Sequence, residues 1–280
     1  MSRIQRVYYK QLVIGDIHGR VDIFKQIYEK EKPNHDVLYD VVMLGDYLDT
    51  HEDISIEDQV NGLKELFEVQ KNHLKDTGSF DMLIGNHDFH YLLDGGTERY
   101  SGYNIKTAMA ANPILKEAID KHWLSFCHID MQNRIIYAHA GVTNTWINYA
   151  QSVPIPINMI DLASYDSFKF KYGKHMDPYG DDPINGPLWV RPGSLLSDMY
   201  KDFDNDVHKE TTWTQVVGHT SCIKPIIAHE DGSKWNEDED WRFAKFYDID
   251  CLTKGYYIVE SFDEGHNIIN REIKNLYQDT

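Results

Sequence analysis

Asp16 and His18 stand two residues apart, directly after the apolar run Leu12–Ile14 and between Gly15 and Gly19. If the apolar run is a β-strand, both side chains leave its end on the same side, because residues i and i+2 share one face of a strand. A carboxylate and an imidazole placed in this way can bind one metal ion. The two glycines let backbone and phosphate approach closely. This segment therefore predicts one half of a metal site.

Similar segments follow four further apolar runs. Asp46 and Asp49 follow Val41–Leu44, Asn86, His87 and Asp88 follow Met82–Ile84, His139 follows Ile135–Tyr137, and His219 follows Val216–Val217. In an open α/β sheet, ligands bind beyond the carboxyl ends of the strands, so we expect these strand ends to converge. One such motif alone is explained as well by a turn, because glycine, asparagine and aspartate dominate turns. Their occurrence together favours a metal site.

The motifs resemble those of the calcineurin-like metallophosphoesterase superfamily, in particular its serine/threonine protein phosphatase branch of bacterial and phage type. The segments GDIHG, GDYLD, GNHD, AHAG and GHT carry the resemblance and lie between residues 15 and 220. The resemblance implies an α/β fold, a two-sheet β-sandwich flanked by helices in an αββα four-layer architecture. It also implies a hydrolase that acts on phosphate ester bonds with two divalent metal ions.

The resemblance further implies which residues bind these ions. One cation would be held by Asp16, His18 and Asp46, and the other by Asp46, Asn86, His139 and His219, with Asp46 shared by both. Carboxylate, imidazole and amide ligands suit Mn²⁺, Fe or Zn²⁺ better than Ca²⁺, and we favour Mn²⁺. Two such ions roughly 3.5 to 4 Å apart would acidify a bridging water and hold the phosphate oxygens for in-line attack by the resulting hydroxide.

Three more residues are candidate catalytic groups. His87, beside Asn86, is the candidate general acid for the leaving alkoxide, because imidazole titrates near neutral pH. The resemblance implies that Asp49 holds His87 and favours its protonated form. Arg191 lies in Leu188–Pro192, which is similar to a segment of bacterial relatives that supplies a phosphate-binding arginine. We expect Arg191 to bind phosphate through its planar fork of donors.

At one position the chain departs from the family pattern. The protein phosphatase branch usually has an arginine directly after the second aspartate of the GDYxD motif, whereas this chain has Thr50, followed by His51, Glu52 and Asp53. Carboxylates at this rim would repel a dianionic monoester more than a diester. His51 could donate to phosphate instead, although a solvated side chain is the simpler interpretation. This departure leaves the substrate class open.

We therefore predict a metal-dependent enzyme that hydrolyses phosphomonoesters, with a phosphoprotein, a small phosphoester or a nucleotide as its partner. One alternative is a phosphodiesterase or a nucleotide or dinucleoside polyphosphate hydrolase. A second alternative is a metal-stabilised binding protein without activity. The presence of His87, which is not needed to hold the metals, argues against the second alternative.

Composition and length limit the other possibilities. The chain has 280 residues, 41% of them hydrophobic, which suits a single domain over residues 1–280 with an irregular substrate-wall insertion at about 143–212. A formal net charge of −17 argues against broad nucleic-acid binding. No apolar run approaches the roughly 18 to 20 residues of a membrane span, so we expect a soluble, cytoplasmic protein without a membrane partner. The three cysteines are too scattered for a disulfide framework.

Hydrophobic spacing predicts the elements that position these residues. We expect helices at Val21–Lys32, from Ser55 to about Leu74, at Phe89–Leu93, at Asn112–His122 and at Asp161–Phe170. The first two helices each connect successive strands, which predicts two βαβ units with parallel strands. Towards the C-terminus, Ala244–Ile249 and Tyr256–Glu260 are expected to form a hairpin around Thr253–Gly255 and to extend a second sheet. We also expect His90 to pack in the interior and the acidic run 236–240 to be a solvated loop.

Overall fold

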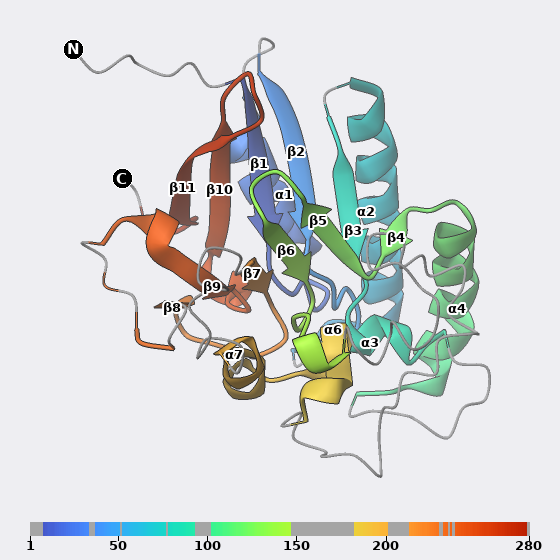
Figure 1. Ribbon diagram of the computed structural model, residues 1–280. Helices are drawn as coiled ribbons and strands as arrows, with labels where there is room; N and C mark the ends of the chain where they lie inside the picture. Colours follow the sequence, from blue (N-terminus) through green and yellow to red (C-terminus); the bar gives the residue numbers. More distant parts are fainter. Residues whose placement is uncertain are drawn as a thin grey trace.

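The computed structural model describes residues 8–33, 37–50, 52–76, 78–92, 102–146, 182–200, 213–229, 232–234, 236 and 239–278. Two mixed β-sheets pack face to face, and helices cover their outer faces (Figure 1). This arrangement confirms the predicted two-sheet α/β architecture. Within the described ranges, no helix combines the length and the apolar character needed to cross a membrane.

The first sheet has six strands in the order β11-β10-β1-β2-β3-β4. Their bounds are β1 Tyr9–Ile14, β2 Leu38–Met43, β3 Phe80–Leu83, β4 Leu124–Ser125, β10 Tyr256–Phe262 and β11 Ile268–Asn275. Strands β1 to β4 are parallel, whereas β10 is antiparallel to both β1 and β11. The crossovers are helix α1, Val21–Glu31, and helix α2, Ile56–Asp76. Both predicted βαβ units are therefore confirmed.

The second sheet has five strands in the order β5-β6-β7-β9-β8. Their bounds are β5 Cys127–Asp130, β6 Ile135–Ala138, β7 Thr214–Val217, β8 Ile226–His229 and β9 Ala244–Asp248. Strands β6, β7 and β9 are parallel, and the two edge strands are antiparallel to their neighbours. The predicted metal ligands closely follow the carboxyl ends of parallel strands in both sheets.

Side-chain alternation along the central strands explains their continuous apolar runs. Leu12 and Ile14 of β1 pack on the side of helices α1 and α2, whereas Val13 meets Tyr137 and Val216 of the other sheet. A strand that is buried on both faces has no polar alternation. On the outer face of the second sheet, Leu195 joins a cluster with strands β7 and β9. This residue belongs to helix α7, Pro192–Tyr200, which follows the short helix α6, Gly186–Trp189.

The helix predicted at Asn112–His122 starts earlier than expected. Helix α4 spans Ile105–Asp120, with Asn104 as its N-cap and Pro113 inside it. The Asn104 side chain accepts a hydrogen bond from the backbone, whereas the Asn112 side chain donates to a carbonyl outside the helix. The sequence rule placed Pro113 in the first turn, where it is best tolerated. Packing of the helix on the core outweighs the cost of an internal proline.

The helix predicted at Phe89–Leu93 also begins earlier, because α3 spans Asn86–Phe89 and Gly85 caps it. Residues 93–101 and the predicted helix Asp161–Phe170 lie outside the described residues, as do His51 and most of the insertion at 143–212. Of the acidic run, 237 and 238 also lie outside them. The three cysteines are free thiols, as expected.

The predicted C-terminal hairpin is wrong. Strand β9 pairs with β7 and β8 in the second sheet, whereas β10 pairs with β1 and β11 in the first. The 3-10 turn Leu252–Lys254 and Gly255, which has a φ of 82°, carry the chain from one sheet to the other. The observed hairpin is β10 with β11. Turn residues signal a change of direction, but they do not reveal which sheet receives the next strand.

Candidate metal centre

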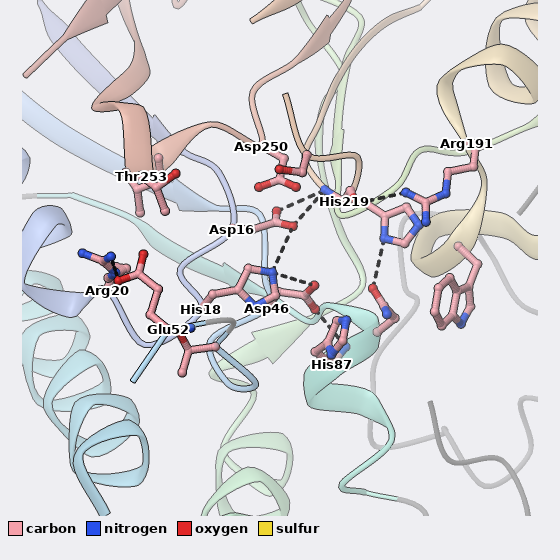
Figure 2. A pocket seen from close by; sticks show the side chains of 15 residues that line it. Asp16, His18, Arg20, Asp46, Glu52, His87, Arg191, His219, Asp250 and Thr253 are labelled. Carbon is pink, nitrogen blue, oxygen red and sulfur yellow. Dashed lines mark hydrogen bonds and ion pairs between the residues drawn. The ribbon is translucent and has the colours of Figure 1, made fainter. Parts of the chain in front are cut away.

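The strand ends converge as predicted (Figure 2). The amide oxygen Oδ1 of Asn86 lies 2.8 Å from His139 Nε2 and 3.0 Å from His219 Nδ1. Asp46 Oδ2 lies 3.4 Å from His139 Nε2 and 3.7 Å from His18 Nε2. These side chains leave the ends of β1, β2, β3, β6 and β7. Their roles as metal ligands remain a prediction.

Asp16 completes this cluster. Both of its carboxylate oxygens accept the backbone N–H of His219, at 3.1 and 3.0 Å, and Oδ2 lies 4.0 Å from His18 Nε2. Asp16, Asp46 and His139 are all buried, and each offers an atom within reach of a common ion. All six residues that the sequence suggests as ligands therefore surround one buried position between the two sheets.

The backbone at this position is strained. His18, Asp46, Asp49 and His219 have positive φ angles of 43°, 50°, 59° and 68°. A residue other than glycine costs on the order of 1 to 3 kcal/mol in this region of φ, and such residues cluster at functional sites. Among the described residues, three others, none of them at this site, share the feature. The strain marks the strand ends as positions whose geometry the fold enforces.

Two glycines allow the loops to approach the candidate aspartates. A Cβ at Gly218 would overlap Asp16 Oδ1, and a Cβ at Gly85 would overlap Asp46 Oδ1. Neither glycine can acquire a side chain without moving a carboxylate. The glycine of each motif is thus explained by close backbone approach.

Asp88 joins the loops that follow β2 and β3. Its Oδ1 accepts from the backbone N–H groups of Tyr47 and Leu48, at 2.9 and 3.2 Å, and its Oδ2 accepts from Gly85 at 3.1 Å. The backbone N–H of His87 in turn donates to Asp46 Oδ1 at 2.9 Å. Asp88 is fully buried, so these bonds hold the two loops in register. Asp46 and His87 consequently lie side by side.

Backbone carbonyls orient two of the imidazoles. His139 Nδ1 donates to the carbonyl of Leu44 at 2.9 Å, and His18 Nδ1 donates to the carbonyl of Leu48 at 3.1 Å. In each ring, Nε2 therefore points at the carboxylate cluster. Burial lowers the pKa of His139, which favours the neutral ring, and its Nε2 lies on the side of Asp46. A lone pair opposite a carboxylate is the arrangement that a bound cation stabilises.

The cluster contains unpaired buried atoms and carboxylates that repel one another. His219 Nε2 and Asn86 Nδ2 are buried and have no hydrogen-bond partner among the described residues. Burial, Asp250 and Asp46 raise the pKa of Asp16 well above its usual value. Buried carboxylates that repel one another need a positive charge between them. The residues present therefore fit a divalent cation.

Asp49 binds three side chains beside this cluster. Its carboxylate accepts from His87 Nδ1 at 3.1 Å, pairs with His90 Nε2 at 2.7 Å, and accepts the hydroxyl of Tyr91. Burial lowers the pKa of His87, but Asp46 and Asp49 outweigh this effect and raise it to about 9. His90 is buried and packs against Tyr91 and Tyr103, as expected, but it also contacts Asp49. Asp49, His87 and His90 form a second group able to hold a metal ion.

A cavity of about 400 Å³ opens over the cluster. Asp16, Asp46, His87 and Arg191 are among its lining residues. Arg191 precedes helix α7, and its Nη1 donates to the carbonyl of His219 at 3.3 Å and to Thr220 Oγ1 at 3.2 Å. In Figure 2 the guanidinium lies beside His219. Arg191 is thus placed at the cavity, while its role in binding phosphate remains a prediction.

The acidic rim differs from the expectation. Glu52 and Thr50 line the cavity, whereas Asp53 is exposed and does not line it. The Glu52 carboxylate is bound by the guanidinium of Arg20, which lines the same cavity. The negative charge expected to repel a dianionic ester is therefore compensated by an arginine in contact with it.

Sequence reasoning missed two charged residues of this cavity. Asp250 follows β9, so the strand-end rule that found the other residues could have found it. Burial raises the pKa of Asp250 to about 6. Arg20 directly follows Gly19 of the first motif, but no rule of spacing places its side chain next to Glu52. That contact depends on how α1 and the loop before α2 pack.

Comparisons with known proteins agree with this geometry. A family model described as calcineurin-like phosphoesterase matches residues 9–253. A search of curated proteins found no match.

Solved structures with the same fold include a cold-active protein tyrosine phosphatase, with a TM-score of 0.57, 16% identity and coverage of 95% of this chain and 79% of the other. Another is the cold-active protein-tyrosine phosphatase of a psychrophilic Shewanella species, with a TM-score of 0.54, 16% identity and coverage of 95% and 81%. A protein serine/threonine phosphatase from Saccharomyces cerevisiae matches with a TM-score of 0.51, 13% identity and coverage of 97% and 81%. At these identities the similarity shows the fold alone.

Proposed function

The chain belongs to the calcineurin-like phosphoesterase family, and from this premise we propose that it hydrolyses phosphomonoesters with a dinuclear metal centre. Asp16, His18 and Asp46 would hold one divalent cation. Asp46, Asn86, His139 and His219 would hold the other, so that Asp46 contributes to both. Divalent cations in this site would supply positive charge to the phosphate oxygens and would acidify the attacking water.

One observation carries the proposal of catalysis: the hydrogen bond from His87 to Asp49 beside the ligand cluster. The six proposed ligands would hold both cations without this pair. Asp49 fixes the ring through Nδ1, so Nε2 is the nitrogen left to deliver a proton to the departing oxygen. General acid catalysis by a positioned imidazole typically contributes a factor of about 10² to 10⁴.

Phosphate recognition in the proposal depends on Arg191, whose planar guanidinium can donate to two phosphate oxygens. Two hydrogen bonds hold this side chain at the cavity. Because Arg20 compensates the charge of Glu52, a dianionic monoester meets less repulsion at the rim than the sequence suggests. This compensation removes the argument that the acidic rim raised against a monoester. Phosphoproteins, small phosphoesters and nucleotides all offer such a group.

The test compares p-nitrophenyl phosphate with bis-p-nitrophenyl phosphate, using metal-stripped protein reconstituted with Mn²⁺. We expect turnover of both to depend on metal and kcat/KM to favour the monoester. A preference for the diester would replace the monoester proposal by a phosphodiesterase or nucleotide hydrolase. Absence of turnover with Mn²⁺, Fe and Zn²⁺ alike would favour a metal-stabilised binding protein.

The Asp46→Asn variant links activity to the metal centre. It should bind less metal than the wild type and lose turnover, because Asp46 would contribute to both ions. Asp22→Asn on the first turn of α1 is the matched control, since that residue is exposed and away from the cavity. Metal content is measured by elemental mass spectrometry after gel filtration. Full metal content in Asp46→Asn would refute the assignment of Asp46.

A further inference from the structure

We propose that Arg20 is a second substrate-binding arginine, which donates to the phosphate oxygens from the side of the cavity opposite Arg191. The inference rests on the proposed phosphoesterase function and assigns a recognition residue to the same site. This chain has Thr50 at the position where the family pattern has an arginine. Arg20, which lines the same cavity as Thr50, would provide the missing positive charge. The ligand class is a phosphate group that carries two negative charges.

The position of Arg20 supports this role. Arg20 is the N-cap residue of α1 and stands two residues after His18. Its side chain lines the cavity together with Thr50 and is 24% exposed. In Figure 2, Arg20 and Glu52 lie on one side of Asp16 and Asp46, and Arg191 lies on the other. A phosphate bound between the two arginines would be contacted from both sides.

The guanidinium has donors left to use. Glu52 binds Nη2, whereas Nε is buried and has no hydrogen-bond partner among the described residues. A guanidinium carries five N–H groups in one plane, so one carboxylate does not exhaust it. Because Nε is shielded from solvent, the Nη groups are the donors that an incoming phosphate would meet.

Electrostatics give Arg20 a specific task. The cavity is lined by the carboxylates Asp16, Asp46, Asp250 and Glu52. Bound cations would offset the charges of Asp16 and Asp46, but they would not reach the rim at Glu52. Arg20 is the group that compensates Glu52. Without the charge of Arg20, the Glu52 carboxylate would repel a dianion that approaches from this side of the cavity.

Glu52 has two opposing effects on this arginine. It holds the guanidinium at the rim, and its negative charge competes with phosphate for the same donors. The Glu52→Gln variant keeps a hydrogen-bond acceptor and removes the charge. We expect it to lower KM for p-nitrophenyl phosphate by about threefold, because phosphate no longer competes with a carboxylate. In the Arg20→Ala background the same change should also lower KM, because the Glu52 carboxylate is then uncompensated and repels the dianion.

The experiment measures KM and kcat for p-nitrophenyl phosphate and, by calorimetry, the Kd for inorganic phosphate, all with Mn²⁺-loaded protein. We expect Arg20→Ala to raise both KM and Kd about tenfold and to leave kcat within about twofold. Arg20→Lys should recover part of this loss, because it restores the charge without the planar fork. Bis-p-nitrophenyl phosphate, with a single charge, should be affected less.

The control is Lys25→Ala, which removes the exposed ion pair between Lys25 of α1 and Glu65 of α2. This pair joins α1 to α2 and neither residue lines the cavity, so its loss should leave KM and Kd unchanged. An unchanged KM and Kd in Arg20→Ala, or an equal change in Lys25→Ala, would overturn the inference. Should Arg20→Ala fail to fold, the same comparison is made with Arg20→Lys and Glu52→Gln, and unchanged values in both would overturn it.

The proposed function can fail separately. Wild-type protein without turnover would refute it, while calorimetry with inorganic phosphate would still test Arg20. Active wild-type protein with phosphate binding unaffected in Arg20→Ala would refute only the role of Arg20.

Discussion

His87 donates through Nδ1 to Asp49, which also pairs with His90 and accepts the hydroxyl of Tyr91. One carboxylate therefore orients a candidate general acid and is itself fixed by two further side chains. Tyr91 in turn accepts the backbone N–H of Asn104 at 3.3 Å, at the start of α4. Hydrogen bonds thus connect the candidate general acid to the N-cap of α4, a helix whose start the sequence predicted several residues too late.

Removal of the candidate acid should affect substrates unequally. We expect His87→Asn to lower kcat about a hundredfold for phosphoserine, whose alkoxide needs a proton, and less than tenfold for p-nitrophenyl phosphate. Asp49→Asn should act in the same direction with a smaller effect, because His87 keeps its position beside Asp46. Steady-state kinetics with both esters measure the ratio. Equal losses on the two substrates would remove His87 from the acid role.

The close approach at Gly218 gives a structural prediction. Gly218→Ala would place a methyl group on Asp16 Oδ1, so the carboxylate must move. We expect less bound metal and a loss of about 1 to 3 kcal/mol in the free energy of unfolding. Urea denaturation and metal content measure the two effects. Gly193→Ala is the control, since a Cβ there meets nothing within 4 Å, and a similar loss in both variants would contradict the explanation.

Two histidines away from the metal centre should give opposite pH dependence of stability. His73 is buried against Tyr28, and burial lowers its pKa. The unfolded chain therefore takes up this proton first, and the contribution of His73 to stability is lost as the pH falls through about 6.5. Burial also lowers the pKa of His128, but its hydrogen bond to Asp81 outweighs this and raises it. The contribution of His128 is therefore complete below about pH 6.5 and lost as the pH rises through the folded value.

Urea denaturation at about pH 5 and about pH 8 measures these contributions. Relative to the wild type, His73→Leu should lose less stability on acidification, whereas His128→Gln should lose more. The two variants serve as controls for each other, because each removes one histidine. Shifts of the same sign in both would contradict the assignment.

A buried ion pair links the two C-terminal strands. Arg271 Nε of β11 donates to Glu260 Oε1 of β10 at 2.6 Å, and Gln11 Nε2 donates to Oε2 at 2.9 Å. We expect Glu260→Ala to lower the free energy of unfolding by about 3 to 5 kcal/mol, because it leaves a guanidinium buried without its carboxylate. Thermal and urea denaturation check the value.

The exposed Glu272 on β11 provides the control for this pair. Glu272→Ala should change stability by less than about 0.5 kcal/mol. The double variant Glu260→Leu with Arg271→Met should recover part of the loss, because it removes the unpaired charge, although Gln11 and Tyr137 still lose their acceptor. A double variant as unstable as Glu260→Ala alone would show that the unpaired charge is not responsible for the loss.

The sequence alone determined the strand ends and the residues that they carry. Apolar runs followed by Asp16, Asp46, Asn86, His139 and His219 are local patterns, and the rule that parallel strands share one edge predicts their convergence. The helices α1 and α2 were also predictable, because their apolar spacing and their end signals are local.

Only the tertiary structure decided the rest. Strand β10 joins β1 rather than β9, and α4 passes through Pro113, because packing of distant segments outweighs local turn and helix signals. The contact of Arg20 with Glu52 likewise joins separate segments of the chain. Contacts of this kind leave no periodicity in the sequence. The candidate metal ligands at the strand ends can therefore be predicted from the sequence. The charged residues around them, such as Arg20 and Glu52, come together only in the folded protein.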